Sequence, residues 1–348
     1  MAVRAKDIAK QLGVSEATFS LVINGKPGIS IKTREKVLAG IRSLGYDYLI
    51  QSPGSSDPVS RVIGFVLYKN HGELLGANSF FPLILDGIES TARNAGYSLA
   101  VINIEREQIR EQISYITDAH CSGFVIFATE MQNGELEYFE KTGLPYVIFD
   151  NYFVEQNINS VKVNNQQGTY LLVKYLHELG HKKIGYLSGG LSINSFIERQ
   201  HYALQAMESF GQKRPQQYVY SIGYPHEEAE HGMEQVLKSH TADDLPTAFL
   251  ADNDLVSVGA IRAVKKAGYR VPEDFSFVGF DDRPICTIVE PKLTTLRLPR
   301  ERFGSEAVVQ LINTINDRSS SSIKVEINGT LIERESCCSP VFNSERVQ

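Results

Sequence analysis

The sequence predicts an α/β protein: a small all-α helix-turn-helix headpiece followed by a two-lobed core, each lobe a parallel sheet with helices on both faces. The first 46 residues carry short amphipathic segments separated by glycine. From residue 61 onward, apolar strand-like runs alternate with amphipathic helices. Such alternation is typical of parallel sheets covered on both faces. It occurs in two successive sets with no long linker between them, which predicts two lobes with a cleft.

The headpiece, residues 1–46, is expected to hold three short helices. Ile8 and Leu12 lie one turn apart on an apolar stripe, and Gly13 can take the positive φ of a helix C-terminus. Ser15 is a good N-cap for the second helix, because its hydroxyl can accept a hydrogen bond from the Thr18 amide. A third helix is expected from about residue 32 to 44. Helix, short glycine turn and helix together form the helix-turn-helix pattern.

Charge separates this headpiece from the rest of the chain. The net charge is −6, but residues 1–46 hold eight bases and three acids, a net +5, which leaves −11 for the remainder. A basic module on an acidic body indicates that only the N-terminal part faces a polyanion. Residues 47–60 contain two prolines, a glycine and four serines but no lysine or arginine, and are expected to form a flexible linker.

The core is expected to span residues 61–341. Its first lobe is assigned to about 61–162 and 292–322, and its second to about 163–291 and 323–341. Strands are predicted at 62–67, 97–102, 123–127, 145–149, 184–187, 247–250 and 275–280, with helices at 83–95, 109–119, 168–179, 199–209 and 255–267. Asp150 and Asp281 each follow a predicted strand. Ligands of open α/β sheets bind beyond the carboxyl ends of the strands, so both carboxylates are placed in the cleft.

Several classes of protein are disfavoured by what the sequence lacks. The longest apolar run, 62–68, is too short to span a membrane, and the N-terminal residues do not resemble a signal peptide, so a cytoplasmic protein is expected. The four cysteines form no C-x-x-C pair, and no metal-ligand spacing, phosphate loop, GxGxxG or nucleophile–base pair stands out. We therefore expect no metal, no cofactor and no enzymatic activity.

Many short motifs follow one another along the chain. They are Lys6-Asp7-Ile8-Ala9, Leu12-Gly13-Val14-Ser15, Asn24-Gly25-Lys26-Pro27-Gly28, Thr33-Arg34-Glu35-Lys36-Val37, Leu44-Gly45-Tyr46, Asn253-Asp254, Val271-Pro272-Glu273-Asp274, Val278-Gly279-Phe280-Asp281-Asp282 and Leu293-Thr294-Thr295. In this order and spacing the chain resembles the LacI family of bacterial transcription regulators. The resemblance implies a DNA-binding headpiece, a hinge and a core similar to periplasmic sugar-binding proteins. It also implies a dimer or tetramer controlled by a small effector, usually a sugar or sugar derivative.

In such a headpiece the second helix enters the major groove of double-stranded operator DNA. The expected contacts are Ser15, Glu16, Ala17, Thr18, Ser20, Leu21 and Asn24, the short hydroxyl and amide side chains among them being suited to phosphates. Glu16 can accept from cytosine N4 or serve only the helix dipole. Leu21 stands where family members often carry a base, which favours contact with a thymine methyl. The linker also departs from the family, because it lacks the basic hinge segment and offers only Leu49 and Ile50 as apolar candidates for the minor groove.

The resemblance also points to effector-binding residues. Asp150, Asp281, Arg199 and Asn253 match the family's cleft residues, Tyr224 falls near its stacking aromatic, and the remaining candidates are Phe80, Phe81 and Ser195. Four of these candidates have a structural alternative: Asp281 as a helix-start acid, Arg199 as a surface ion-pair residue, and the two phenylalanines as core. The loop 68–77 is longer than is usual, and its Lys69 and His71 can either grip an acidic group or be solvated.

These observations leave one main hypothesis and two competitors. The main one is an effector-controlled transcription repressor, with dimer favoured over tetramer because no C-terminal heptad repeat follows Arg334. A carbohydrate-binding protein of a transport system would explain the core but not the basic headpiece. An enzyme would fit the fold class but lacks a recognisable catalytic constellation.

Overall fold

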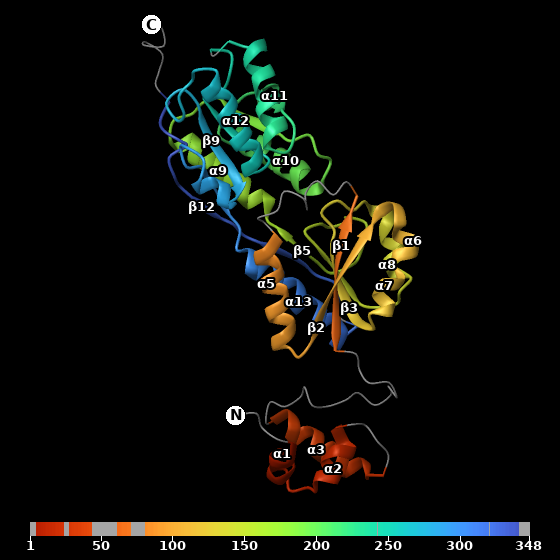
Figure 1. Cartoon of the computed structure of the whole chain (residues 1–348). Coiled ribbons are helices and arrows are strands. Elements are labelled where there is room, and N and C mark those ends of the chain that lie inside the picture. The colour runs from red at the N-terminus through yellow and green to blue at the C-terminus, as the bar shows by residue number, and fades with distance from the viewer. Residues whose placement is uncertain are drawn as a thin grey trace. The chain divides into compact units, whose positions relative to one another are not determined.

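The computed structural model describes residues 5–23, 28–43, 61–70, 81–241, 243–319 and 321–340 (Figure 1). Several predictions fall outside these ranges: the linker 47–60 with Leu49 and Ile50, most of the 68–77 loop, and the site candidates Asn24 and Phe80. The chain divides into two compact units, residues 1–60 and residues 61–348.

The first unit contains the three expected helices: α1 (Ala5–Gln11), α2 (Glu16–Ile23) and α3 (Ile31–Ser43). Gly13 takes a φ of +67°, and the Thr18 amide donates to Ser15 Oγ at 3.0 Å, so the predicted helix end and N-cap are both confirmed. The three helices enclose a small core of Ile8, Ala9, Phe19, Val22, Val37 and Ile41.

The second unit contains two six-stranded sheets in the described part of the chain, one in each lobe. The sheet of lobe 1 has the order β11-β5-β4-β3-β1-β2 and is parallel throughout. Its strands are β1 (Val62–Lys69), β2 (Ser98–Glu105), β3 (Cys121–Phe127), β4 (Tyr146–Phe149), β5 (Ser160–Val163) and β11 (Lys324–Ile327). It carries the helices α5 (Phe81–Asn94), α6 (Ile109–Gln112), α7 (Ser114–Asp118), α8 (Leu136–Glu140) and α13 (Arg300–Asn316).

The sheet of lobe 2 has the order β12-β10-β9-β8-β6-β7, and only its edge strand β12 is antiparallel. Its strands are β6 (Ile184–Ser188), β7 (Val219–Ser221), β8 (Ala248–Ala251), β9 (Ser276–Asp281), β10 (Thr294–Arg297) and β12 (Thr330–Ile332). It carries α9 (Asn165–Glu178), α10 (Asn194–Ser209), α11 (His226–Ser239) and α12 (Asp254–Lys266). Among the helices described, none is long and apolar enough to cross a membrane.

Close helix packing in lobe 1 depends on glycine. Helices α5 and α13 lie side by side (Figure 1), and a Cβ on Gly87 would come within 2.0 Å of the Glu301 carbonyl oxygen. A Cβ on Gly304 would likewise meet the Ile84 carbonyl oxygen at 2.2 Å. The two glycines therefore allow the helix backbones to approach closely.

In the described residues the chain crosses between the lobes three times: after β5, after β10 and after β11. The first crossing, between residues 163 and 165, agrees with the expected boundary. The predicted assignment of the C-terminal segments differs from the structure. Strand β10, expected in lobe 1, pairs with β9 in lobe 2, and β11, expected in lobe 2, pairs with β5 in lobe 1. Sheet membership depends on distant pairing partners, which local sequence patterns do not reveal.

Candidate functional site

A pocket lies where the two lobes of the core meet. Lobe 1 contributes the end of β3, the residue after β4 and the first residue of α5. Lobe 2 contributes the start of α10, the N-terminus of α12 and the end of β9. The lining residues are Phe81, Phe127, Thr129, Asp150, Ile193, Ser195, Phe196, Arg199, Asn253, Asp281 and Arg283. Its position at the carboxyl ends of the strands is where open α/β sheets bind ligands.

The lobe 1 wall combines aromatic rings with one carboxylate. Asp150 directly follows β4 with a φ of +61°, and its Oδ2 accepts from Thr129 Oγ1 at 2.6 Å. Burial raises the pKa of Asp150 to about 6. Phe81 stacks on Phe65 and meets Phe127 edge-on, at centroid distances of 5.8 and 6.0 Å. This wall therefore offers an acceptor beside flat apolar surface.

The lobe 2 wall centres on Asp281, the last residue of β9. Its φ is +107°, a backbone conformation that side chains other than glycine rarely adopt and that often marks functional positions. Its Oδ2 accepts from Arg283 Nε and Nη2, both at 3.1 Å. Its Oδ1 lies 3.4 Å from Arg199 Nη2 and has no hydrogen-bond donor among the described residues. One oxygen of this buried carboxylate is therefore left for a ligand.

Arg199 is held on three sides. Its Nε donates to Asn165 Oδ1 at 3.0 Å, and its Nη1 donates to the Asp252 carbonyl at 2.7 Å. The guanidinium lies 3.7 Å from the centroid of the Phe280 ring. Because its side chain is only 5% exposed, Arg199 is a buried pocket residue and not the surface ion-pair residue of the alternative hypothesis.

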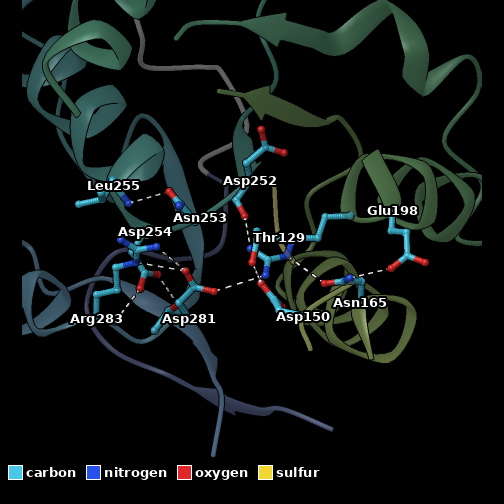
Figure 2. A network of polar contacts seen from close by, with 12 residues as sticks. Thr129, Asp150, Asn165, Glu198, Asp252, Asn253, Asp254, Leu255, Asp281 and Arg283 are labelled. Atoms are coloured by element: carbon cyan, nitrogen blue, oxygen red, sulfur yellow. Dashed lines mark hydrogen bonds and ion pairs between the residues drawn. The ribbon is translucent and has the colours of Figure 1, made fainter. Parts of the chain in front are cut away.

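Asn253 caps α12 and lines the pocket. Its Oδ1 accepts from the backbone amides of Leu255 and Val256 at 3.1 and 3.3 Å (Figure 2). Its Nδ2 is buried and has no hydrogen-bond partner among the described residues. An unsatisfied buried donor costs free energy, which a ligand acceptor would recover.

Two further carboxylates lie behind the lining. Asp252 accepts from Tyr186 Oη at 2.5 Å and from the Gly189 amide at 2.6 Å, and burial raises its pKa to about 6. Asp254 accepts from the Arg283 amide at 2.7 Å, and burial raises its pKa, with the nearby Asp281 charge adding to the effect. Both are engaged by protein donors and so support the pocket from behind.

Most of the predicted effector residues come together in this pocket. Phe81, Asp150, Ser195, Arg199, Asn253 and Asp281 line it. Tyr224 does not; it is buried and packs edge-on against Phe196 at 6.3 Å. Helix α10 begins at Asn194, so Arg199 lies in its second turn and does not open the helix as expected.

Five lining residues were not predicted from the sequence: Phe127, Thr129, Ile193, Phe196 and Arg283. Thr129 lies just past a predicted strand, so the strand-end rule that identified Asp150 could have identified it as well. Arg283 has no such signal, because an arginine two residues after a strand is ordinarily solvated.

In the headpiece, Glu16, Ala17 and Ser20 are exposed on α2 and Leu21 is half-buried. The Ser15 and Thr18 hydroxyls lie 2.8 Å apart, and Ser15 forms the helix cap described above. The side of α2 that is expected to face DNA is therefore accessible in the described residues.

Comparison with known proteins identifies the family. A model described as "Bacterial regulatory proteins, lacI family" matches residues 5–47, and one described as "Periplasmic binding protein-like domain" matches residues 173–337. The HTH-type transcriptional repressor PurR of Pasteurella multocida is 30% identical over 336 residues, covering 95% of this chain and 97% of PurR. The chain belongs to the LacI family. PurR of Photobacterium profundum is 28% identical over 334 residues, covering 95% of this chain and 97% of that protein.

Solved structures of LacI-family regulators share the fold. A lac repressor dimer bound to operator and the anti-inducer ONPF matches with a TM-score of 0.70 and 26% identity, covering 97% of this chain and all of that one. A CelR–cellobiose complex matches with a TM-score of 0.72 and 24% identity, covering 96% of this chain and all of that one. This LacI-family chain is therefore a DNA-binding transcription regulator with an effector core, and neither an enzyme nor a transport protein.

Proposed function

We propose that this LacI-family regulator is a cytoplasmic homodimeric repressor whose operator affinity is set by an uncharged sugar-like effector in the inter-lobe pocket. The observation that carries the proposal is that two residues lining one pocket each have a buried polar atom without a hydrogen-bond partner among the described residues: the acceptor Oδ1 of Asp281 and the donor Nδ2 of Asn253. A hydroxyl group can donate to one and accept from the other, which is the chemistry of a polyol.

Charge and shape support the same ligand class. The charged side chains lining the pocket are two carboxylates, Asp150 and Asp281, and two guanidiniums, Arg199 and Arg283. Equal numbers of each sign favour an uncharged ligand over a sugar phosphate or an amine. Phe81, Phe127 and Phe196 add apolar surface for the C–H face of a sugar ring.

On DNA, α2 of each headpiece is assigned to one half of a palindromic operator. Glu16, Ala17, Ser20 and Leu21 would face base edges or the backbone, while Ser15, Thr18 and Asn24 would contact phosphates. Closure of the lobes around the effector would change the arrangement of the two cores in the dimer and hence the spacing of the headpieces. Operator affinity would then follow effector binding.

We expect a second copy of this chain to cover exposed apolar side chains of the core. Ile288 is 71% exposed beside a groove lined by Val258, Ile261 and Ile285, and Val101 is 47% exposed on the edge strand β2. Analytical ultracentrifugation tests this assignment: Ile288→Asp should weaken a wild-type dimer, and a wild-type monomer at micromolar concentration would contradict it.

Selection of genomic DNA by the full-length protein, followed by sequencing, tests the DNA assignment. A palindromic site should be enriched. Thermal-shift and calorimetric titration with neutral mono- and disaccharides, sugar phosphates, amino sugars and nucleobases then tests the ligand class. Binding of a charged sugar or a nucleobase in place of a neutral sugar would overturn it.

Variants connect the pocket to DNA binding. Arg199→Ala and Asp281→Ala should leave affinity for the selected operator within about twofold and abolish its response to the sugar. Asp244→Asn, at an exposed lobe 2 carboxylate, is the control and should respond like wild type. Loss of DNA binding with an intact response would contradict the mechanism.

A further inference from the structure

A lysine is buried where the two lobes meet. Lys162 belongs to β5, the last lobe 1 strand before the chain first crosses to lobe 2, and is only 6% exposed. Its Nζ lies 2.5 Å from Oε1 of Glu198, which is on α10 of lobe 2. Burying a lysine costs free energy unless its charge is paired. The ion pair with Glu198 therefore offsets the cost of burying Lys162.

Lobe 1 holds the lysine in place from its own side. The Lys162 ammonium lies 4.2 Å from the centroid of the Tyr152 ring, within range of a cation–π interaction. Glu326 of β11 lies 3.6 Å from the same nitrogen. Lys162 is therefore a fixed part of lobe 1, and Glu198 is its partner across the junction.

On the lobe 2 side, Glu198 is connected to the pocket. Its Oε2 accepts from Asn165 Nδ2 at 2.8 Å, and Asn165 Oδ1 accepts from Arg199 Nε at 3.0 Å. Figure 2 shows Glu198 and Asn165 at one end of the polar network that reaches Asp150 and Asp281. An unbroken chain of polar contacts thus runs from the lobe 1 lysine to the pocket arginine.

Helix α10 carries a second inter-lobe contact on the same face. Asn194 Nδ2 donates to Asn151 Oδ1 at 2.5 Å and to the Tyr152 carbonyl at 3.2 Å. Asn194 and Glu198, which reach lobe 1, are four residues apart, as are the pocket residues Ser195 and Arg199. Residues at i and i+4 share a helix face, so any movement of α10 relative to lobe 1 changes both sets of contacts together.

We propose that Lys162 and Glu198 form an inter-lobe latch that positions Arg199 through Asn165 and so couples the arrangement of the lobes to the effector pocket. The role of Arg199 rests on the proposed function, whereas the latch itself can be tested without any effector. Breaking a buried ion pair at one end leaves a buried charge, but replacing both partners by uncharged side chains of similar size removes that penalty. The double variant Lys162→Met/Glu198→Gln should therefore fold like wild type while lacking the latch.

Electron–electron double resonance measures the lobe arrangement directly. p-Acetylphenylalanine replaces the exposed residues Tyr115 of lobe 1 and Glu227 of lobe 2. The spin label reacts with the ketone of this residue, so the free cysteines of the chain stay unlabelled. Excess unlabelled protein suppresses distances between protomers. The control is Lys266→Met/Glu234→Gln, the same two substitutions in an ion pair of 2.6 Å between α12 and α11 within lobe 2, whose lysine is 66% exposed.

Each single variant should unfold at lower urea concentration than wild type, and the double variant should unfold near wild type. The inter-lobe distance distribution of the double variant should broaden or gain a second population, and that of the control pair should match wild type. A double variant with the wild-type distribution would overturn the latch, since a purely structural pair predicts that result.

A second readout tests the positioning of Arg199. For whichever neutral sugar binds wild type, the double variant should bind about tenfold more weakly, while the control pair binds as wild type. If no neutral sugar binds but the distance distribution still changes, the proposed ligand class fails and the latch stands. If a sugar binds both proteins equally, the link from the latch to Arg199 is refuted.

Discussion

Replacing Arg283 with methionine is predicted to destabilise the core strongly. Arg283 is 5% exposed, and its Nε and Nη2 both donate to Asp281 Oδ2 at 3.1 Å. Arg283→Met keeps most of the side-chain volume but removes this partner of Asp281, which is itself only 3% exposed. In the described part of the chain, the ion-pair contact that remains for the Asp281 carboxylate is Arg199 Nη2 at 3.4 Å.

Removing one partner of a buried ion pair typically costs about 3–5 kcal/mol. Because Arg199 still offsets part of the Asp281 charge, we expect a loss of about 3 kcal/mol in the free energy of unfolding. Arg283→Met/Asp281→Asn removes both charges with little change in shape, so it should recover most of that loss. The non-additivity of the two changes would then measure the coupling between the side chains.

The assay is urea unfolding followed by far-UV circular dichroism, since the sequence has no tryptophan for fluorescence. Arg270→Met is the control: Arg270 pairs with Asp274 at 3.0 Å but its side chain is 69% exposed, so its loss should leave the urea midpoint close to that of wild type. An Arg283→Met protein within about 1 kcal/mol of wild type, or a double variant no more stable than the single, would refute the reasoning.

Three further predictions concern other parts of the molecule. Burial raises the pKa of Asp252 to about 6, above its unfolded value, so the native state binds the proton more tightly and stability falls as pH rises from about 4 to 6. Urea midpoints measured from pH 4 to 8 should show a flatter slope for Asp252→Asn than for wild type. Gly87→Ala places a methyl group 2.0 Å from the Glu301 carbonyl oxygen and should cost about 1–3 kcal/mol in thermal unfolding, and an unchanged melting temperature would contradict the packing argument. Ser15→Ala removes the hydrogen bond to the Thr18 amide and should cost the headpiece about 1 kcal/mol, measured by thermal unfolding of the headpiece in the absence of DNA, with unchanged unfolding of the core.

The elements that sequence analysis predicted well are those set by short-range interactions. The end of α1 at Gly13 and the cap of α2 at Ser15 depend on residues within one helical turn, and both were predicted in detail. Asp150 and Asp281 were placed in the cleft because each follows an apolar strand, and the structure brings both to one pocket. Tyr224 was placed only by loose alignment, and the structure buries it against Phe196 outside the lining.

By itself, the sequence determined the fold class and the separate basic headpiece, because periodicity, caps and charge balance are local properties. Strand ends pointed to Asp150 and Asp281, and the resemblance to the LacI family implied the other pocket residues that were predicted. Only the tertiary structure decided which sheet holds β10 and β11, that Arg283 is buried against Asp281, and that Lys162 pairs with Glu198. Lys162 and Glu198 are 36 residues apart on different lobes. Whether such a charge is solvated or paired depends on how the lobes fold together, since only burial makes the pairing of a lysine necessary.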